Sequence, residues 1–352
     1  MNINMKTIQF NKSSYKDFAN SLEKFFTEYL AVEKRVSKHT IRSYRDTFIL
    51  LLDYLKNVRN KPADKLEFID FNRELILAFL KWLQDQRFCS SGTRNQRLAA
   101  IKSFFCFMIY EDPIHIAEWK TICSIKQQKQ IRETVRYLTI EGIKCLLEQI
   151  PTNEKEGWRN LTMLSLLYNT GMRVSELTGL TPACIRFSKP YIIEVFGKGA
   201  KKRLVPVEEN MMKLLGQYME ENRLNRPGKE DQPLFFNCHG GELTPAGITY
   251  VLKKYAALAR IINPSLIPDK ISPHNLRTSR AMHWLQAGIE IYYIRDLLGH
   301  VSVQTTEIYA RTDSKSKREA LEKAYAVVGI TEPEITSWEK NPKLVDFLKS
   351  LA

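Results

Sequence analysis

In the N-terminal third of the chain, hydrophobic side chains recur every three or four positions, which is the spacing of amphipathic helices. Four segments carry this pattern: "FANSLEKFFTEYL", "SKHTIRSYRDTFILLLDYLK", "NRELILAFLKWLQDQ" and "SSGTRNQRLAAIKSFFCFMIYED". The last three begin at residue types that cap helices, namely Ser37, Asn72, and Ser90 or Ser91. Short connections between the segments predict a compact four-helix domain over residues 1–112.

The pattern changes over residues 113–136. Pro113 ends the fourth segment, and the stretch "KTICSIKQQKQIRETVR" is polar, with five basic residues against one acidic residue. Such a composition predicts a basic linker between two domains. One further surface helix is the alternative interpretation.

A second domain, predicted over residues 137–330, returns to helical spacing. Thr139 is placed to cap "IEGIKCLLEQI", and Gly171 closes the buried helix "WRNLTMLSLLYNTG". The segment "YIIEVFGKGAKKRLVPV" instead has two runs of β-favouring residues around a glycine- and lysine-rich turn, which predicts a hairpin. Later helices are expected at residues 208–223, 245–260, 273–286, 290–298, 302–310 and 314–327. The predicted fold class is therefore mainly α with a small antiparallel β-sheet.

The charge of the chain narrows the class of partner. There are 53 Lys and Arg residues against 39 Asp and Glu residues, which gives a formal charge of +14. A surplus of this size favours a nucleic-acid partner over a merely soluble surface. A membrane surface would also attract it, but no apolar run reaches the roughly 18 residues needed to span a bilayer.

The N-terminus lacks the charged-then-apolar pattern of a signal peptide. The six cysteines are scattered and form no CxxC pair, which argues against a zinc site and against a disulfide framework. We therefore expect reduced thiols in the core and a cytoplasmic protein without a metal or another cofactor.

Cutting a DNA phosphodiester without a metal requires a nucleophile, positive charge at the non-bridging oxygens and a proton for the leaving oxygen. Arginine binds phosphate oxygens with a planar, permanently charged fork. Lysine or histidine can supply the proton. Tyrosine can form a covalent aryl-phosphate ester that retains the bond energy for rejoining. The second domain contains each of these parts.

Two of the parts lie in its first half. "TGMRVSEL" places Arg173 directly after a glycine helix stop, with Glu176 three residues on to orient the guanidinium. Taken alone, such a pair is more often a surface salt bridge. "FGKGAKKR" places Lys198 between two glycines at the hairpin tip, although taken alone this motif is better explained as a solvated loop.

The other parts lie near the C-terminus. "SPHNLRTSRAMHW" places His274 and Arg277 one turn apart at the start of a helix, where anions bind. A capping histidine beside a surface arginine is the alternative. "LLGHVSVQTTEIYA" then supplies His300 in a turn and Tyr309 nine positions later, with small polar residues between them.

The order R, K, HxxR, LLGH and Y resembles that of the tyrosine recombinases, or phage integrase family, and is closest in style to the Xer-like members. "TGMRVSELTGL", "GKGAKKRLVPV", "SPHNLR" and "LLGHVSVQTTEIYA" carry the resemblance in the second domain. "SKHTIRSYRDTF" and "SGTRNQRLAAIKSFF" resemble the family's N-terminal helical core-binding, SAM-like domain. The resemblance implies a C-terminal mixed α/β catalytic domain and site-specific DNA recombination.

The resemblance also implies catalytic roles. Tyr309 would attack the scissile phosphate and become linked to the 3′ end of the broken strand. Arg173 and Arg277 would hold the non-bridging oxygens as negative charge develops. Lys198 would protonate the leaving 5′ oxygen. The family needs neither a metal nor ATP, because the arginines take the place of the metal.

His274 would assist proton transfer near the tyrosine, and His300 would hydrogen-bond the phosphate. The chain departs from the family at one point. After the second catalytic arginine the family often has His-Ser/Thr-Phe, whereas this chain has Thr278, Ser279 and Arg280. Packing below this helix, or a DNA contact from Arg280, is therefore expected to differ.

Basic side chains outside the catalytic set are predicted to reach DNA phosphates or base edges, with a solvated face as the alternative for each of them. Most lie at the polar starts of the N-terminal helices or in the hairpin. The predicted DNA-contact residues are Lys38, Arg42, Arg45, Arg94, Arg97, Lys201, Lys202 and Arg280.

The tail, residues 331–352, contains "NPKLVDFLKSLA", an amphipathic helix that requires a groove. The resemblance implies that this helix docks on a neighbouring protomer and ties four subunits around two DNA duplexes, with identical subunits or a related second recombinase as partners. Docking on its own catalytic domain is the alternative.

Two other functions fit parts of this pattern. A type IB topoisomerase uses the same Arg, Lys, His and Tyr chemistry, but the Xer-like first domain disfavours it. A non-catalytic DNA-binding regulator would keep the fold, but the complete set of catalytic residues argues against it.

Overall fold

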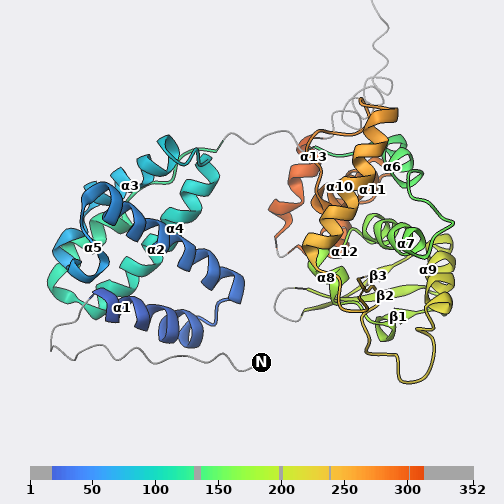
Figure 1. Ribbon diagram of the computed structural model, residues 1–352, viewed down its shortest axis with the longest axis horizontal. Coiled ribbons are helices and arrows are strands. Elements are labelled where there is room, and N and C mark those ends of the chain that lie inside the picture. Colours follow the sequence, from blue (N-terminus) through green and yellow to red (C-terminus); the bar gives the residue numbers. More distant parts are fainter. Residues whose placement is uncertain (1–17, 131–135, 198–200, 238, 301, 313–352) are drawn as a thin grey trace, which may run out of the picture. The chain divides into compact units, whose positions relative to one another are not determined.

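The computed structural model describes residues 18–130, 136–197, 201–237, 239–300 and 302–312. The chain divides into two compact units, residues 1–132 and 133–352 (Figure 1). The elements are mainly helical, and the second unit contains a three-stranded antiparallel sheet. This arrangement confirms the predicted fold class.

The helices of the first unit are α1 (Phe18–Lys24), α2 (Lys38–Arg59), α3 (Arg73–Asp85), α4 (Ser91–Glu111) and α5 (Ile116–Cys123). A π-helical segment, Phe25–Glu33, continues α1, and 3-10 turns lie at Ala63–Lys65, Phe68–Asp70 and Pro113–His115. The hydrophobic faces of these helices enclose a core rich in aromatic rings. The Phe25 and Phe104 rings pack edge to face at its centre, with centroids 5.3 Å apart.

Three helices of this unit begin at predicted caps. The Ser37 hydroxyl accepts a hydrogen bond from the Thr40 amide, and the Asn72 side chain accepts one from Leu75. At α4 the cap is Ser90 rather than Ser91. Each cap satisfies one of the backbone amides that a helix start leaves without a partner.

The predicted linker over residues 113–136 is wrong for its first part. Residues 116–123 form α5, and the Trp119 and Ile122 side chains are fully buried in the core of the first unit. The Trp119 ring stacks on Phe105 with centroids 4.9 Å apart. The alternative of a further helix therefore holds here, but the helix is packed rather than on the surface.

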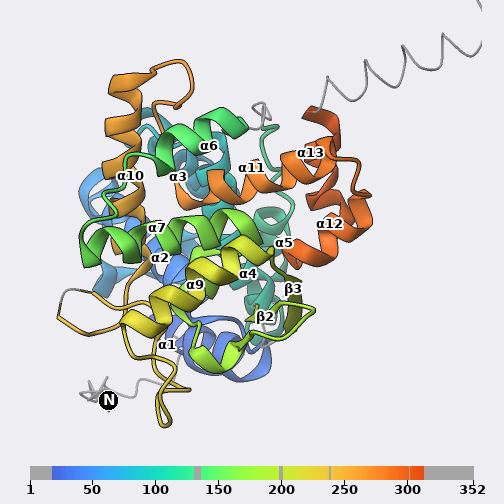
Figure 2. The same ribbon diagram turned by 90° about the vertical axis from the view of Figure 1, so that its right-hand side faces the viewer.

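The elements of the second unit are α6 (Ile140–Leu147), α7 (Lys155–Thr170), α8 (Val174–Thr178), β1 (Ile185–Arg186), β2 (Ile192–Phe196), β3 (Lys202–Pro206), α9 (Glu209–Glu221), α10 (Pro245–Ile262), α11 (Pro273–Gln286), α12 (Ile291–Leu298) and α13 (Glu307–Thr312). In this unit α7 packs against both α9 and α11, and Figure 2 shows it running between them. Thr139 caps α6 as predicted, through a hydrogen bond from the Gly142 amide.

The predicted hairpin is present. Strands β2 and β3 pair antiparallel, with Val195 opposite Arg203 and Phe196 opposite Lys202. The sequence did not predict β1, a two-residue strand that pairs with the other side of β2. The tip of the hairpin, residues 198–200, lies outside the described residues.

The single helix predicted over residues 302–310 is replaced by two shorter elements. Residues Val303–Thr305 form a 3-10 turn, and α13 begins only at Glu307. The predicted helix at 314–327 and the predicted tail helix lie outside the described residues. No helix in the described ranges is both long and apolar enough to cross a membrane.

Candidate active site

The turn between α7 and α8 brings Arg173 into the site. Gly171 ends α7 in a left-handed conformation with φ +60°, which glycine adopts without strain. A side chain at this position would also clash, because a Cβ would lie 2.9 Å from a methyl carbon of Leu298. The chain then reverses, and Arg173 stands at the start of α8 as the sequence predicts.

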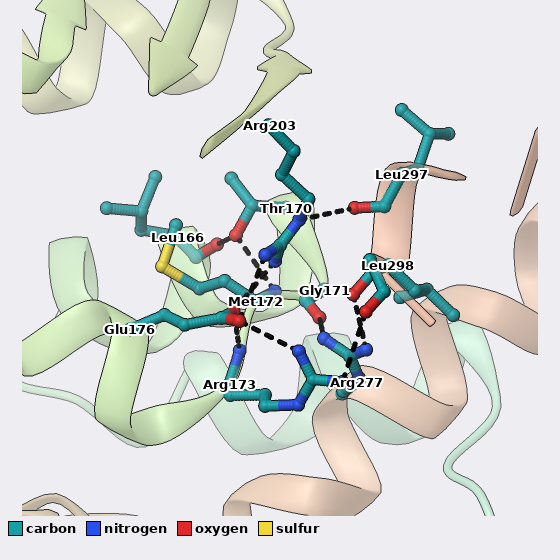
Figure 3. A network of polar contacts seen from close by, with 11 residues as sticks. Leu166, Thr170, Gly171, Met172, Arg173, Glu176, Arg203, Arg277, Leu297 and Leu298 are labelled. Carbon is teal, nitrogen blue, oxygen red and sulfur yellow. Dashed lines mark hydrogen bonds and ion pairs between the residues drawn. The ribbon is translucent and has the colours of Figure 1, made fainter. Parts of the chain in front are cut away.

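Glu176 is the buried centre of an ion-pair network that Figure 3 shows. Its carboxylate accepts hydrogen bonds from Arg173 Nη1 at 2.8 Å and from the Arg173 backbone amide at 2.7 Å. The Arg203 guanidinium binds both carboxylate oxygens, at 2.9 Å and 2.7 Å. The predicted contact between Glu176 and Arg173 is therefore present; the carboxylate is buried, while the Arg173 side chain is 39% exposed.

Burial alone would raise the pKa of the Glu176 carboxyl. The hydrogen bonds and charge of Arg203, together with the bonds from Arg173, outweigh this effect and hold the pKa below its ordinary value. Glu176 is therefore ionised at neutral pH and balances two arginine charges.

Arg277 projects from α11 and is 2% exposed. Its Nη1 donates to the Gly171 carbonyl at 2.7 Å, and its Nη2 donates to the Leu298 carbonyl at 2.6 Å (Figure 3). Burial and the neighbouring charge of Arg173 lower the pKa of Arg277 to about 10, so it still carries its charge at neutral pH. The two carbonyls fix the plane of the guanidinium.

Tyr309 lies on α13, which packs against α11, and it is 4% exposed. Burial raises the pKa of its phenol. The charges of Arg277 and Arg173 and a hydrogen bond with the Thr278 side chain act in the opposite direction. The phenol is thus close enough to both predicted phosphate-binding arginines for their charges to favour its ionised form.

His300 follows the end of α12 and faces the tyrosine. Its Nδ1 lies 2.9 Å from the Thr306 hydroxyl, and its ring stands next to that of Tyr309. Burial and the charges of Arg277 and Arg173 lower the pKa of His300 to about 4. The imidazole is therefore neutral at pH 7 and has one N–H to donate.

His274 lies in the first turn of α11, where its side chain is exposed to solvent. The surrounding protein removes part of the water from the ring, which disfavours the protonated form and lowers its pKa. The charges of Arg277 and Arg173 lower the pKa further. At neutral pH a histidine of this kind can accept a proton. Lys198, the predicted proton donor, lies outside the described residues.

The structure brings together Arg173, Glu176, Arg277, His300 and Tyr309, with His274 within the electrostatic influence of the arginines. The sequence interpretation missed Arg203. A signal for it exists, because strand alternation in "KKRLVPV" places Arg203 on the same face as the buried Val205.

The predicted DNA-contact residues fall into two groups. Lys38, Arg42, Arg45, Lys201 and Lys202 are exposed. Arg45 pairs with Asp46, and Lys202 pairs with Glu194. For this group, binding to DNA stays a prediction.

The other three are engaged within the protein, which argues against the predicted contacts. Arg94 is 6% exposed, and Arg97 binds the Ser43 carbonyl at 2.9 Å, which ties α4 to α2. Arg280 pairs with Glu208 and lies over the rings of Tyr168 and Trp284. Each of these side chains therefore has a packing role.

Ser279 falls on the Ser/Thr position of the family pattern and is fully buried. Its hydroxyl accepts a hydrogen bond from the Leu138 amide at 2.8 Å and donates one to the Asn275 carbonyl at 2.7 Å. Ser279 thus fastens the backbone of Leu138 to α11. Among the described side chains, no cluster of three or more His, Cys, Asp or Glu residues is placed to bind a metal.

Comparisons with known proteins show the family to which the chain belongs. Residues 136–316 match the phage integrase family, and residues 24–112 match its N-terminal SAM-like domain. A protein of Sinorhizobium fredii that is named as an integrase/recombinase, y4rC, is 33% identical over 340 residues, which are 96% of this chain and 100% of the relative. The tyrosine recombinase XerD of Oceanobacillus iheyensis is 33% identical over 82% of this chain and 92% of its own length.

The fold is also found among solved structures. The XerH site-specific recombinase, in a post-cleavage complex with palindromic difH substrate, matches with a TM-score of 0.66 and 23% identity. The match covers 85% of this chain and 83% of that protein. Both predicted parts of the fold, the SAM-like domain and the catalytic domain, are therefore shared with proteins of known structure.

Proposed function

The chain belongs to the phage integrase family and is a site-specific DNA recombinase, and we propose that it cuts and rejoins strands with Tyr309 as its nucleophile. The Tyr309 oxygen attacks the scissile phosphorus as the phenol loses its proton. The bond from phosphorus to the 5′ oxygen breaks, which leaves a 3′-phosphotyrosyl link and a free 5′ hydroxyl. A 5′ hydroxyl then attacks this link, restores the phosphodiester and releases the tyrosine, so no ATP or metal is required.

The observation that carries the proposal is the placement of two buried or half-buried arginines beside one buried phenol. Arg173 and Arg277 are fixed by Glu176 and by backbone carbonyls before any substrate binds. Guanidinium groups held in this way stabilise the charge that develops on a phosphorane without rearranging. Their charges also favour ionisation of Tyr309.

Further roles follow in the same proposal. His300 donates a hydrogen bond to the phosphate from its neutral ring, and His274 takes part in proton transfer near the tyrosine. Lys198, which lies outside the described residues, protonates the leaving 5′ oxygen. Residues 137–330 form the catalytic domain and residues 1–112 the core-binding domain, with the rest of 113–136 as the connection between them.

The substrate is double-stranded DNA with specific recombination sites, and the reaction takes place in the cytoplasm. We propose a homo-tetramer on two duplexes, with the tail at residues 331–352 docked on the neighbouring protomer. A related second recombinase is the alternative partner in such an assembly. Integration, excision and dimer resolution all use this chemistry.

A trapping experiment tests the nucleophile. DNA sites are first selected from random-sequence duplexes by binding to the full-length protein. When a selected site has a nick just 3′ of the scissile phosphate, cutting releases the short fragment that carries the new 5′ hydroxyl. Rejoining is then impossible, so a covalent adduct accumulates. We expect an adduct with the wild type and none with Tyr309→Phe, while both bind the DNA with similar affinity. An adduct with the Phe variant would show that another residue attacks.

A second measurement separates recombination from topoisomerase activity. A topoisomerase would relax supercoiled plasmid that lacks the selected site, whereas we expect relaxation or strand exchange only on plasmid that carries it. A non-catalytic regulator would bind the site and form no adduct at all.

A further inference from the structure

Arg203 is almost fully engaged in contacts within the protein. Its side chain is 11% exposed, and its guanidinium binds both oxygens of Glu176. Its Nε donates to the Leu297 carbonyl at 3.0 Å. A fork that binds a carboxylate at two points fixes both its distance and its orientation. Arg203 therefore links β3, α8 and the end of α12 at one point (Figure 3).

The end of α12 holds three arginines by three consecutive backbone carbonyls. Leu297 O accepts from Arg203, Leu298 O accepts from Arg277 at 2.6 Å, and Gly299 O accepts from Arg173 at 3.4 Å. The last carbonyls of a helix have no partner inside the helix and carry its negative dipole end, which favours cations. The two proposed phosphate-binding arginines and Arg203 thus share one anchor.

The packing around Gly299 shows how closely Arg203 is fitted to that anchor. Gly299 adopts φ +66°, and a Cβ built there would lie 3.0 Å from Arg203 Cδ and 3.1 Å from its Nη1. A larger residue at this turn would push Arg203 away from Glu176. The residue after this turn is His300, so the position of the turn also sets the position of the imidazole.

We propose that Arg203 is a positioning residue for the recombination reaction. It holds Glu176 and the last turn of α12 in a fixed relation, and through them it aligns Arg173 and His300 for the phosphate. This inference rests on the proposed function of those two side chains. Arg203 itself is not a catalytic residue, because its donors are directed at Glu176 and Leu297.

The effect of removing it follows from these contacts. Arg203→Met keeps most of the side-chain length and removes the bonds to the carboxylate and the carbonyl. Glu176 then retains only Arg173 as a charged partner, and the α12 turn loses one of its three arginine contacts. Misalignment of about 1 Å in a catalytic group can slow a reaction by roughly 100-fold. DNA affinity should change little, because Arg203 makes no phosphate contact in the proposal.

The experiment compares Arg203→Met with a matched control, Arg159→Met. Arg159 is also a shielded arginine with several hydrogen bonds, to Glu156, Asn160 and the Phe236 carbonyl. It lies near the start of α7, at the end opposite Gly171. For each full-length variant we measure the thermal midpoint of unfolding and the affinity for the selected DNA site. We also measure the single-turnover rate of adduct formation on the nicked site, with protein at saturating concentration.

We expect Arg203→Met to form the adduct roughly 100-fold more slowly than the wild type, with DNA affinity within about threefold, while Arg159→Met keeps the wild-type rate. Arg203→Lys should fold and remain slow, because an ammonium cannot bridge two oxygens and a carbonyl. Glu176→Gln should cost less rate when added to Arg203→Met than when made in the wild type, because part of its effect acts through the pair with Arg203.

A substrate with a sulfur at the bridging 5′ position separates alignment of the phosphate from protonation of the leaving group, because a thiolate leaves without a proton. We expect the Arg203→Met defect to persist on this substrate. A defect that disappears would assign Arg203 to leaving-group protonation instead and overturn the proposal. Three other outcomes would also overturn the proposal: a wild-type rate in Arg203→Met, a defect confined to DNA affinity, or failure of both the Met and Lys variants to fold. Absence of the adduct in the wild type would instead reject the function itself.

Discussion

The rings of His300 and Tyr309 lie side by side, with centroids 6.4 Å apart and planes inclined by 27°. The Thr306 hydroxyl, itself fully buried, holds His300 Nδ1 from the segment between the two residues. The loop that carries the histidine and the helix that carries the tyrosine are therefore positioned by one local contact.

We predict that His300 contributes to acid sensitivity. Its pKa is about 4 in the folded protein, against an ordinary value near 6.5. Below about pH 6.5 the unfolded chain takes up a proton that the folded chain does not. The contribution to stability is therefore complete above that pH and is lost as the pH falls towards 4. His300→Gln should lose less unfolding free energy between about pH 7.5 and pH 5 than the wild type.

The measurement is urea unfolding of both proteins at the two pH values. His39→Gln provides a control, because this ring is exposed on α2 in the other unit. An equal loss of stability in wild type and His300→Gln would contradict the buried, neutral state of His300.

We predict that Glu176→Ala is among the more damaging changes in the second unit. It leaves the shielded Arg203 guanidinium without its carboxylate and removes the fixed partner of Arg173. Breaking a buried ion pair by removing one partner costs about 3–5 kcal/mol. Urea unfolding should show this loss, whereas Glu209→Ala, which removes an exposed carboxylate paired with Lys189 and Lys213, should leave the unfolding free energy nearly unchanged. Equal effects would mean that Glu176 is not the centre of the network.

We predict that Gly299→Ala slows DNA cutting, while Gly288→Ala does not. Both glycines have positive φ, +66° and +85°, so both substitutions strain the backbone by about 1 kcal/mol. Only at Gly299 would the added methyl group meet a neighbour, Arg203, at 3.0 Å; at Gly288 no atom lies within 4 Å. The difference between the two rates of adduct formation isolates the displacement of Arg203. Similar rates would show that this contact does not matter for the reaction.

We predict that Trp119→Ala destabilises the first unit by about 3–5 kcal/mol, as expected for truncation of a fully buried large side chain. Circular dichroism during urea unfolding measures the loss, and limited proteolysis should show new cleavage within residues 113–123. Tyr110→Ala is the matched control, because that ring is 84% exposed. If Trp119→Ala left the unfolding free energy unchanged, residues 116–123 would be better described as part of the linker.

Much of the fold was predictable because its signals are local. Caps such as Ser37, Asn72 and Thr139 each satisfy a backbone amide a few residues away, and the hairpin shows strand alternation on both sides of a glycine-rich turn. Whether α5 packs into the core or stays in solvent depends on residues outside α5. Trp119 is buried because Phe105 and the rest of the aromatic core accept it, and a basic, polar segment gives no sign of that.

The proposed catalytic positions could be selected from the sequence because each lies in a short motif, whereas the residues that support them could not. Arg203 contacts Glu176 and Leu297, which are 27 and 94 positions away along the chain. Arg94, Arg97 and Arg280 look like solvent-facing basic residues in the sequence. Only the packing shows that Arg94 is buried and that Arg97 and Arg280 tie elements together. Such long-range contacts leave no periodic trace in one sequence.

The three arginines at the end of α12 are held by main-chain oxygens, which every amino acid supplies. Substitutions along the outer face of this helix, where Tyr292 and Tyr293 are 58% and 64% exposed, therefore leave those acceptors in place as long as the helix persists. The arginine geometry proposed to receive the phosphate thus does not depend on which side chains this helix carries on its outer face. That face of the molecule is free to acquire new contacts while the cutting chemistry is retained.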